Sequence, residues 1–343
     1  MAKAAIVTLY GETNFGNRLQ NFALETFLRS FDIKCESLIF CKKQPLAYKT
    51  KRAIKKCMGL FGLKKTEINR EASFKRFSKK HISTRKIPIK YDLNKLSEEY
   101  DFFIAGSDQV WNPSFGNFDS IFNQMFLVFA PKDKRIAFSP SFGVEHIPSP
   151  WIEKFRKGLL GFEYLSCREE SGLRIIEELT GEKAPLIADP TLLVPIEEWI
   201  KLTELISENN PQSVCYFLGD KPSIAFNNDS FIDVLDKKSG NYYSYNPSDF
   251  LSLIRNAKMV YTDSFHACVF SIMFGTPFCV YQRKGNGENM FSRIETLLKL
   301  FGIERIIPGN PIEVDPATKD RVLSKLRADA TDYVLKFLYR KEI

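Results

Sequence analysis

Paired cysteines, a membrane-spanning apolar run and a high histidine content are all missing from this sequence. Its seven cysteines are scattered without a CxxC pair, which argues against a disulfide framework or a zinc site and favours a reducing cytoplasm. No apolar run reaches the roughly 18 residues of a membrane span. The apolar part of the amino-terminal segment is too short for a signal peptide and leads directly into a strand-like run. We therefore expect a cytoplasmic protein without a resident metal ion.

The positive charge is concentrated in one part of the chain. The net charge is +8, yet residues 42–90 alone hold 17 Lys or Arg and only two acidic residues. The rest of the chain is therefore acidic, which argues against a nucleic-acid partner bound by a basic face throughout. Leu, Ile, Met and Phe lie between the lysines of this segment. It fits peripheral contact with an anionic membrane at its inner face and equally a solvated helical insertion, and both interpretations stay open.

Strand-like and helix-like segments alternate along the chain. A buried strand at 4–10 is followed by a Gly/Asn turn, an amphipathic helix at 18–31 and a second strand at 34–40. This order is typical of a parallel sheet with crossover helices. Further strands are expected within 100–113, 135–143, 163–179, 184–194, 213–219, 258–263 and 277–282.

The chain is long enough for two domains, because 343 residues exceed the usual size of one hydrophobic core. We place the boundary near Pro190 to Pro195. Residues 1–190 then form one Rossmann-like domain, with a basic helical insertion at about 42–90, and residues 191–343 form a second one. The final helix, about 316–339, is expected to cross back to the first domain. The predicted fold class is α/β, with two Rossmann-like domains facing a cleft, and ligands of such sheets bind beyond the carboxyl ends of the strands.

The segment TDSFHACVFSIMFGTPFCV, residues 262–280, carries the clearest chemical signal. It places His266, one of only three histidines, in the first turn of an apolar helix that follows a strand. Asp263 or Ser264 can cap this helix. A helix start offers unpaired backbone N–H groups and partial positive charge, so it binds anions. A histidine beside a bound anion can transfer a proton, and we interpret this segment as the centre of a phosphate-handling active site.

Two polar clusters in the amino-terminal half are typical of loops that bind a substrate. In YGETNFGNRLQN, residues 10–21, hydrogen-bond donors at a helix start are offered by Asn14, Asn17 and Arg18. This is not a GxGxxG motif, so it indicates a dinucleotide site only weakly. In GSDQVWNP, residues 106–113, the groups suited to sugar hydroxyls and to stacking on a sugar face are Asp108, Gln109, Asn112 and Trp111. Either loop could instead bond only its own backbone.

Two further clusters supply cations. In SCREESG, residues 166–172, Arg168 can hold a carboxylate or phosphate in a bidentate fork. In RKGNGENMFSR, residues 283–293, the groups that can close over an anion are Arg283, Asn289, Ser292 and Arg293. Taken alone, each cluster is better explained without a function, the first by a surface salt bridge to Glu169 or Glu170 and the second by a solvated loop and a surface helix.

Taken in order, these motifs resemble the polysaccharide pyruvyl transferase family. The resemblance spans about residues 4–301, is weakest in the basic segment, and rests on TLYGETNFGNRLQN, FFIAGSDQVWNP, IAFSPSFG, SCREESG, IADPTLLV, VYTDSFHACVFSIMFGTPF and MFSRIETLLK. It implies a GT-B-like fold and transfer of the enolpyruvyl unit of phosphoenolpyruvate to a sugar, usually as a cyclic ketal, in capsule, exopolysaccharide or cell-wall glycan synthesis. It also implies phosphoenolpyruvate as donor substrate, no further cofactor, and a glycan or lipid-linked sugar as acceptor.

The resemblance also assigns roles to residues. Arg168 and His266 match positions that bind or act on phosphoenolpyruvate, with His266 as the proton donor. Many members carry an arginine two residues before the histidine, where this chain has Ser264. The donor anion is therefore left to Arg168, to the helix start at Ser264 and Phe265, and to Arg283, Asn289, Ser292 and Arg293. The expected acceptor-binding residues are Asn14, Asn17, Arg18, Asp108, Gln109, Trp111 and Asn112.

Two other functions fit the same motifs. A nucleotide-sugar glycosyltransferase of GT-B architecture would bind a diphosphate at the same helix start. A non-catalytic glycan- or lipid-binding relative would keep the fold without turnover. The pyruvyl transferase is favoured because donor-type and acceptor-type clusters are both present.

Overall fold

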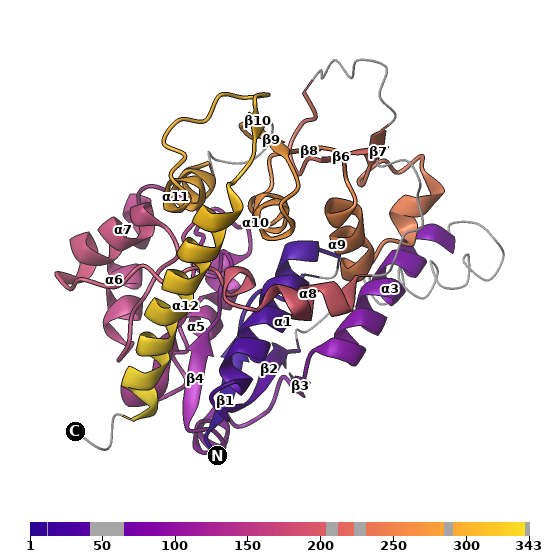
Figure 1. The fold of residues 1–343 in the computed structure, drawn as a ribbon. Coiled ribbons are helices and arrows are strands. Elements are labelled where there is room, and N and C mark those ends of the chain that lie inside the picture. Colours follow the sequence, from indigo (N-terminus) through magenta and orange to yellow (C-terminus); the bar gives the residue numbers. More distant parts are fainter. Residues whose placement is uncertain (12, 42–64, 204–211, 223–230, 285–290, 340–343) are drawn as a thin grey trace.

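Two sheets, one in each half of the chain, organise the molecule (Figure 1). The computed structural model describes residues 1–11, 13–41, 65–203, 212–222, 231–284 and 291–339. The first sheet has the strand order β3-β2-β1-β4-β5 and the second β10-β9-β8-β6-β7. Every neighbouring pair is parallel except β9 and β10. The predicted class, α/β with two Rossmann-like domains, is confirmed.

The first sheet is built on β1, whose residues from Ala4 to Val7 are fully buried, as a continuous apolar run in a parallel sheet requires. Its strands are β1 (Lys3–Val7), β2 (Lys34–Phe40), β3 (Thr84–Ile87), β4 (Phe102–Ala105) and β5 (Arg135–Ala137). The helices of this half are α1 (Phe15–Arg29), α3 (Lys65–His81), α4 (Leu93–Glu98), α5 (Phe118–Met125), α6 (Ile152–Leu160) and α7 (Glu170–Thr180). The Asn14 side chain caps α1 by accepting from the backbone N–H of Asn17 at 3.0 Å.

The second sheet packs against α10. Every residue of this helix except Phe274 is buried, as its uniformly apolar sequence requires. The strands are β6 (Ser213–Tyr216), β7 (Phe231–Asp233), β8 (Val260–Thr262), β9 (Phe278–Val280) and β10 (Pro311–Ile312). The helices are α8 (Ile196–Leu202), α9 (Pro247–Arg255), α10 (Phe265–Phe274), α11 (Ser292–Leu300) and α12 (Pro316–Leu338). Short 3-10 turns are η1 (Lys132–Lys134), η2 (Ser149–Trp151), η3 (Pro190–Leu192) and η4 (Gly240–Tyr243).

The structure corrects two local predictions. Residues 84–87 are not part of a helical insertion but form the edge strand β3, which pairs in parallel with β2; residues 42–64 of the predicted insertion lie outside the described residues. The strand expected at 184–194 reduces to an isolated bridge between Cys167 and Leu186, because Asp189 and Pro190 turn the chain into η3.

Elements from both halves pack against each other. In α12, Tyr333 donates to the carbonyl of Ala137 in β5 at 2.9 Å, and Phe337 contacts Phe102 of β4 with ring centroids 5.3 Å apart. Figure 1 shows α12 descending beside the first sheet. Trp199 of α8 lies between Phe22 of α1 and Phe270 of α10, with centroid distances of 5.4 and 4.9 Å. Among the helices described, none combines the length and apolar character needed to cross a bilayer.

Replacing Trp199 with Ala should strongly destabilise the protein, because the fully buried indole fills the space between α1 and α10. We expect a loss of about 3–5 kcal/mol in the free energy of unfolding, measured by urea denaturation. The neighbouring Ile200→Ala is the matched control, since Ile200 is 39% exposed. Equal denaturation midpoints for the two variants would contradict this packing role.

Candidate active site between the two domains

A cavity of about 310 Å³ lies where the two domains meet. The residues that line it lie at or just after the carboxyl ends of β1 and β4 in the first sheet and of β6 and β8 in the second. Parallel sheets bind ligands beyond these strand ends. The residues predicted from the sequence that line it are Asn14, Asn17, Asp108, Gln109, Ser264, Phe265, His266, Arg283 and Arg293. The structure therefore brings donor-type and acceptor-type candidates around one space.

His266 lies in the first turn of α10, as the sequence predicted, and its side chain is largely buried. Its Nε2 is 3.8 Å from Oδ2 of Asp189 and has no hydrogen-bond partner. The ring packs directly on α1, because a Cβ added at Gly16 would lie 2.2 Å from Nδ1. Burial lowers the pKa of His266, although the carboxylates of Asp189 and Asp108 act in the opposite direction. Burial therefore favours a neutral imidazole.

Arg168 is held by carboxylates. Its Nη1 pairs with Asp189 and lies 3.3 Å from Oγ of Ser107, and its Nη2 is 3.4 Å from Asp108 Oδ1. The side chain is buried and does not line the cavity. The structure thus corrects the prediction that Arg168 holds the donor anion, because its charge is already compensated and it lies outside the cavity. Its carboxylate partners raise its pKa although burial acts to lower it.

Asp189 is the residue that reasoning from the sequence missed. Its Oδ2 accepts from Ser107 Oγ at 2.6 Å and from Arg168, while Oδ1 accepts from the backbone N–H and the hydroxyl of Thr191 at 3.0 and 2.7 Å. Burial alone would favour the neutral acid, but Arg168 and then His266 hold the pKa of Asp189 at about 2. One ionised carboxylate therefore fixes Arg168 and lies beside His266. The only signal for it was an Asp-Pro pair after an apolar run.

Arg293 differs from Arg168 because no carboxylate of the described residues pairs directly with it, although the charges of Glu169 and Asp108 act to raise its pKa. It lies in the first turn of α11, is 6% exposed, and forms no ion pair with any described residue. With the Gln109 amide oriented so that its oxygen faces the guanidinium, Gln109 accepts from Nη2 and Nη1 at 2.8 and 3.0 Å. Burial and then the charge of Arg168 lower the pKa of Arg293 to about 9. At neutral pH it remains a cation at the cavity wall.

Arg283 and Asp263 shape the second-domain wall. Nε of Arg283 is 3.2 Å from Oδ2 of Asp263, whose two oxygens also accept from the backbone N–H groups of Leu218 and Gly219 at 2.7 and 2.8 Å. Asp263 therefore binds the loop after β6 and does not cap α10. Ser264 is the N-cap residue by position, but its side chain makes no capping bond.

Asn17 and Asp108 form the first-domain wall. The Asn17 amide donates to Oδ2 of Asp108 and its oxygen accepts from the backbone N–H of Gly11 at 3.2 Å. Asp108 has a left-handed backbone, with φ of 78°, which is uncommon for a residue with a side chain and is found at functional loops. An adjoining cavity of about 340 Å³, mostly apolar, shares Leu9, Asn17 and Phe115 with the first.

The structure also corrects several predicted site residues. Trp111 is fully buried between Phe126 and Phe142, and its Nε1 donates to the carbonyl of Met125 at 3.2 Å. It therefore has no face for a sugar. Asn112 is also fully buried and caps a turn by accepting from Ser114 at 2.9 Å.

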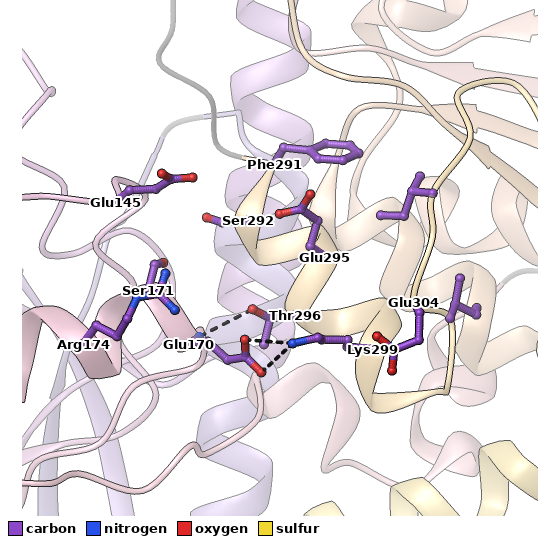
Figure 2. A pocket seen from close by; sticks show the side chains of 12 residues that line it. Glu145, Glu170, Ser171, Arg174, Phe291, Ser292, Glu295, Thr296, Lys299 and Glu304 are labelled. Atoms are coloured by element: carbon purple, nitrogen blue, oxygen red, sulfur yellow. Dashed lines mark hydrogen bonds and ion pairs between the residues drawn. The ribbon is translucent and has the colours of Figure 1, made fainter.

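Two more predicted residues do not line the cavity, and a third cannot be placed in it. Arg18 is 2% exposed, with its guanidinium 3.6 Å from the centre of the Tyr10 ring, and it does not line the cavity. Ser292 lines a different cavity, shown in Figure 2. Asn289 lies outside the described residues.

Comparisons with known proteins agree with the resemblance found in the sequence. The profile of the family described as polysaccharide pyruvyl transferase matches residues 14–284. No protein of curated function matches the chain. At these low identities, the following similarities to solved structures concern the overall fold alone.

A functionally uncharacterised protein from Klebsiella pneumoniae subsp. pneumoniae is 14% identical, with 87% of this chain and 100% of that chain covered and a TM-score of 0.45. A putative UDP-N-acetylglucosamine 2-epimerase from Listeria monocytogenes is 9% identical, with 100% and 89% covered and a TM-score of 0.48. An alpha-glucosyltransferase in complex with UDP is 10% identical, with 97% and 96% covered and a TM-score of 0.41.

Replacing Asp189 with Asn should lower the pKa of His266 further, because the substitution removes the carboxylate that favours the imidazolium. An NMR titration of the imidazole resonances measures this directly, and His81 and His146 serve as internal references. The surface variant Asp119→Asn is the control, and circular dichroism checks that both variants stay folded. An unchanged or raised pKa of His266 would show that Asp189 does not act on it.

Proposed function

Because the chain belongs to the polysaccharide pyruvyl transferase family, we propose that it transfers the enolpyruvyl unit of phosphoenolpyruvate to a sugar of a glycan or lipid-linked precursor. The observation that carries the proposal is Arg293, a buried cation without an ion pair among the described residues, at a cavity shared with His266. An uncompensated buried charge is costly. An anionic ligand in this cavity would remove that cost.

The donor has two anionic groups, and the cavity offers two places for them. The N-terminus of α10 supplies backbone N–H groups suited to the phosphate from Phe265 onward, whereas the N–H of Ser264 already donates to Oγ1 of Thr262 at 3.0 Å. Arg293 and Arg283 on the same cavity supply guanidinium groups suited to the carboxylate. Many relatives have an arginine in place of Ser264. In this chain, Arg283 and Arg293 supply the positive charge instead.

His266 is the proposed proton donor. The approach of a phosphate dianion raises the pKa of a neighbouring imidazole, and Asp189 at 3.8 Å stabilises the imidazolium. His266 then protonates the methylene carbon while a sugar hydroxyl oxygen bonds to C2, and the hydroxyl proton returns to the imidazole. A second hydroxyl then bonds to C2, the bond from C2 to the phosphate oxygen breaks, and this hydroxyl's proton leaves with the phosphate. The product is a cyclic ketal.

The acceptor is proposed to bind against the first domain. Asp108 and Asn17 offer an acceptor and a donor for sugar hydroxyls, and holding two hydroxyls near C2 is mainly catalysis by positioning. Gln109 contributes by holding Arg293. Arg168 and Asp189 are positioning residues, since both are buried behind the cavity wall.

Substitution of His266 and Arg293 should separate chemistry from donor binding. We expect His266→Ala to lower kcat roughly 100-fold or more and to leave the affinity for phosphoenolpyruvate nearly unchanged. Arg293→Gln should weaken that affinity by about tenfold or more, through the loss of a charged hydrogen bond. Phosphate release with the surface glycan of the source cell measures turnover, and calorimetry measures donor binding.

The half-exposed Arg156, changed to Gln, is the control for removal of a charge. Near-normal turnover by His266→Ala would exclude it as the acid. Release of UDP from a UDP-sugar without any use of phosphoenolpyruvate would favour the glycosyltransferase instead.

A membrane contact through α3 is proposed as well. Among the described residues of this helix, Lys75, Arg76, Lys79 and Lys80 are exposed, and only Lys75 has an ion-pair partner, Glu71 at 3.3 Å. Each such charge near an anionic surface contributes about 1 kcal/mol. A lipid-linked acceptor would be reached at such a surface.

Sedimentation with phosphatidylglycerol-containing vesicles tests this contact. We expect salt-sensitive binding by the wild type and a clear loss when the four basic residues of α3 are changed to Gln, because these charges supply the attraction. Neutral phosphatidylcholine vesicles are the control. Binding that is absent, or insensitive to both salt and the substitutions, would remove this proposal.

A further inference from the structure

The first residue of α1 does not line the active-site cavity, although its neighbours in the sequence do. Asn14, Gly16 and Asn17 form part of the cavity beside His266. Phe15, which lies among them in the sequence, does not line this cavity and is fully buried. The Phe15 side chain therefore has another role than binding a substrate.

Phe15 packs against aromatic residues of the second domain. Its ring stacks on that of Phe250 in α9, with 4.7 Å between the centroids and 6° between the planes. Tyr216, the last residue of β6, contacts both rings edge-on at centroid distances of 5.8 and 5.0 Å. Stacked and edge-on aromatic pairs attract each other beyond the effect of burial. The start of α1 is therefore bound to the second domain as well as to its own.

Helix α3 adds an aromatic ring and a cation to these contacts. The centroid of the Phe74 ring lies 5.1 Å from that of Phe15. The Arg70 guanidinium lies over the rings of Phe15, Phe74 and Tyr242, at 4.9, 5.3 and 4.3 Å from their centroids. Figure 1 shows α1, α3 and α9 next to one another. These residues form one group, called here the Phe15 cluster, which consists of Phe15, Arg70, Phe74, Tyr216, Tyr242 and Phe250.

Arg70 is the charged member of the Phe15 cluster. It is 4% exposed, and no carboxylate of the residues that the structure describes pairs with it. Its Nη1 donates to the carbonyl of Tyr242 in η4 at 2.7 Å, and Ser73 of the same helix donates to the carbonyl of Ser244 at 2.9 Å. A guanidinium removed from water is stabilised by the faces of aromatic rings. Arg70 therefore joins α3, from the first half of the chain, to the second half and to the ring at the start of α1.

The contact between the domains at His266 lies next to this cluster. Gly16 follows Phe15 directly, and a Cβ added there would lie 2.2 Å from Nδ1 of His266. Tyr216 also lines the active-site cavity, so it belongs to both the cluster and the site. Because Phe15 is held by α9 and β6, Gly16 is held against the imidazole, and the first-domain wall keeps its distance from the second domain.

We infer that Phe15 and Arg70 are positioning residues, which fix the first-domain wall of the cavity relative to His266. The inference rests on the proposed transferase function for its effect on turnover. In that function, acceptor hydroxyls held by the first domain must lie near C2 of a donor held by the second, and small displacements of reacting groups lower the rate strongly. Arg283 and Arg293, which are proposed to bind the donor, do not belong to the cluster, so donor affinity should not depend on it.

Phe15→Leu and Arg70→Met test the inference, because each keeps an apolar side chain in place but removes the stacked ring or the guanidinium. We expect each to lower kcat about tenfold or more and to leave the affinity for phosphoenolpyruvate, measured by calorimetry, nearly unchanged. Phe27→Leu is the matched control. Phe27 lies in the same helix and packs on Phe31 and Phe138 of the first domain, so its loss should leave kcat unchanged at temperatures where circular dichroism shows a folded protein.

The imidazole of His266 gives a second readout that does not require turnover. Loss of the cluster should let water reach the ring, which raises the pKa of His266 because burial is the main cause of its low value. An NMR titration should show this shift for Phe15→Leu and Arg70→Met but not for Phe27→Leu. The charged groups that face the imidazole are unchanged in every variant; they are Asp108, Arg168, Asp189 and Arg293.

The two readouts separate this inference from the transferase function. The inference is overturned if Phe15→Leu and Arg70→Met both keep the kcat or the His266 pKa of the wild type, or if Phe27→Leu changes them to the same extent. If the wild type does not use phosphoenolpyruvate while the two variants still shift the pKa of His266, only the transferase function is contradicted.

Discussion

The buried ion pair between Arg168 and Asp189 is the constraint on which the rest of the site depends. It joins the segment before α7 to the start of η3. In the loop after β4, Ser107 bonds to both members of the pair and Asp108 accepts from Arg168. Breaking one partner of such a pair would leave an uncompensated buried charge, which is strongly destabilising. The wall behind the cavity is therefore rigid, and Asp189 keeps its fixed place beside His266.

The charges on the two sides of this wall are arranged differently. Behind it, Arg168 is compensated by Asp189 and Asp108. In front of it, Arg293 is held by a neutral amide, Gln109, and keeps its full charge. The two arginines are buried to a similar extent but have different roles. Arg168 holds the wall together through its ion pairs, whereas Arg293 carries a charge that an anionic ligand could pair with. This difference arises from the neighbours of each arginine and not from its exposure.

Sequence patterns predicted most of the fold and part of the site, for identifiable reasons. The apolar run of β1 and the polar start of the apolar helix α10 are local signals, so the sheet and His266 could be found. Trp111 and Asn112 were misplaced because an aromatic or amide residue after a strand looks the same whether it faces solvent or core. Asp189 was missed because its partners, Arg168 and Ser107, are 21 and 82 positions away. Such pairings become visible only when the chain is folded.

The packing of His266 on Gly16 depends on the absence of a side chain at position 16. The imidazole from one domain rests against backbone of the other, in the space that a methyl group would otherwise occupy. Because the side chain of Gly16 is only a hydrogen atom, the two domains can come this close together at this point. Any bulkier residue at this position would push the two domains apart, so the groups that line the cavity from each domain would no longer keep their present spacing.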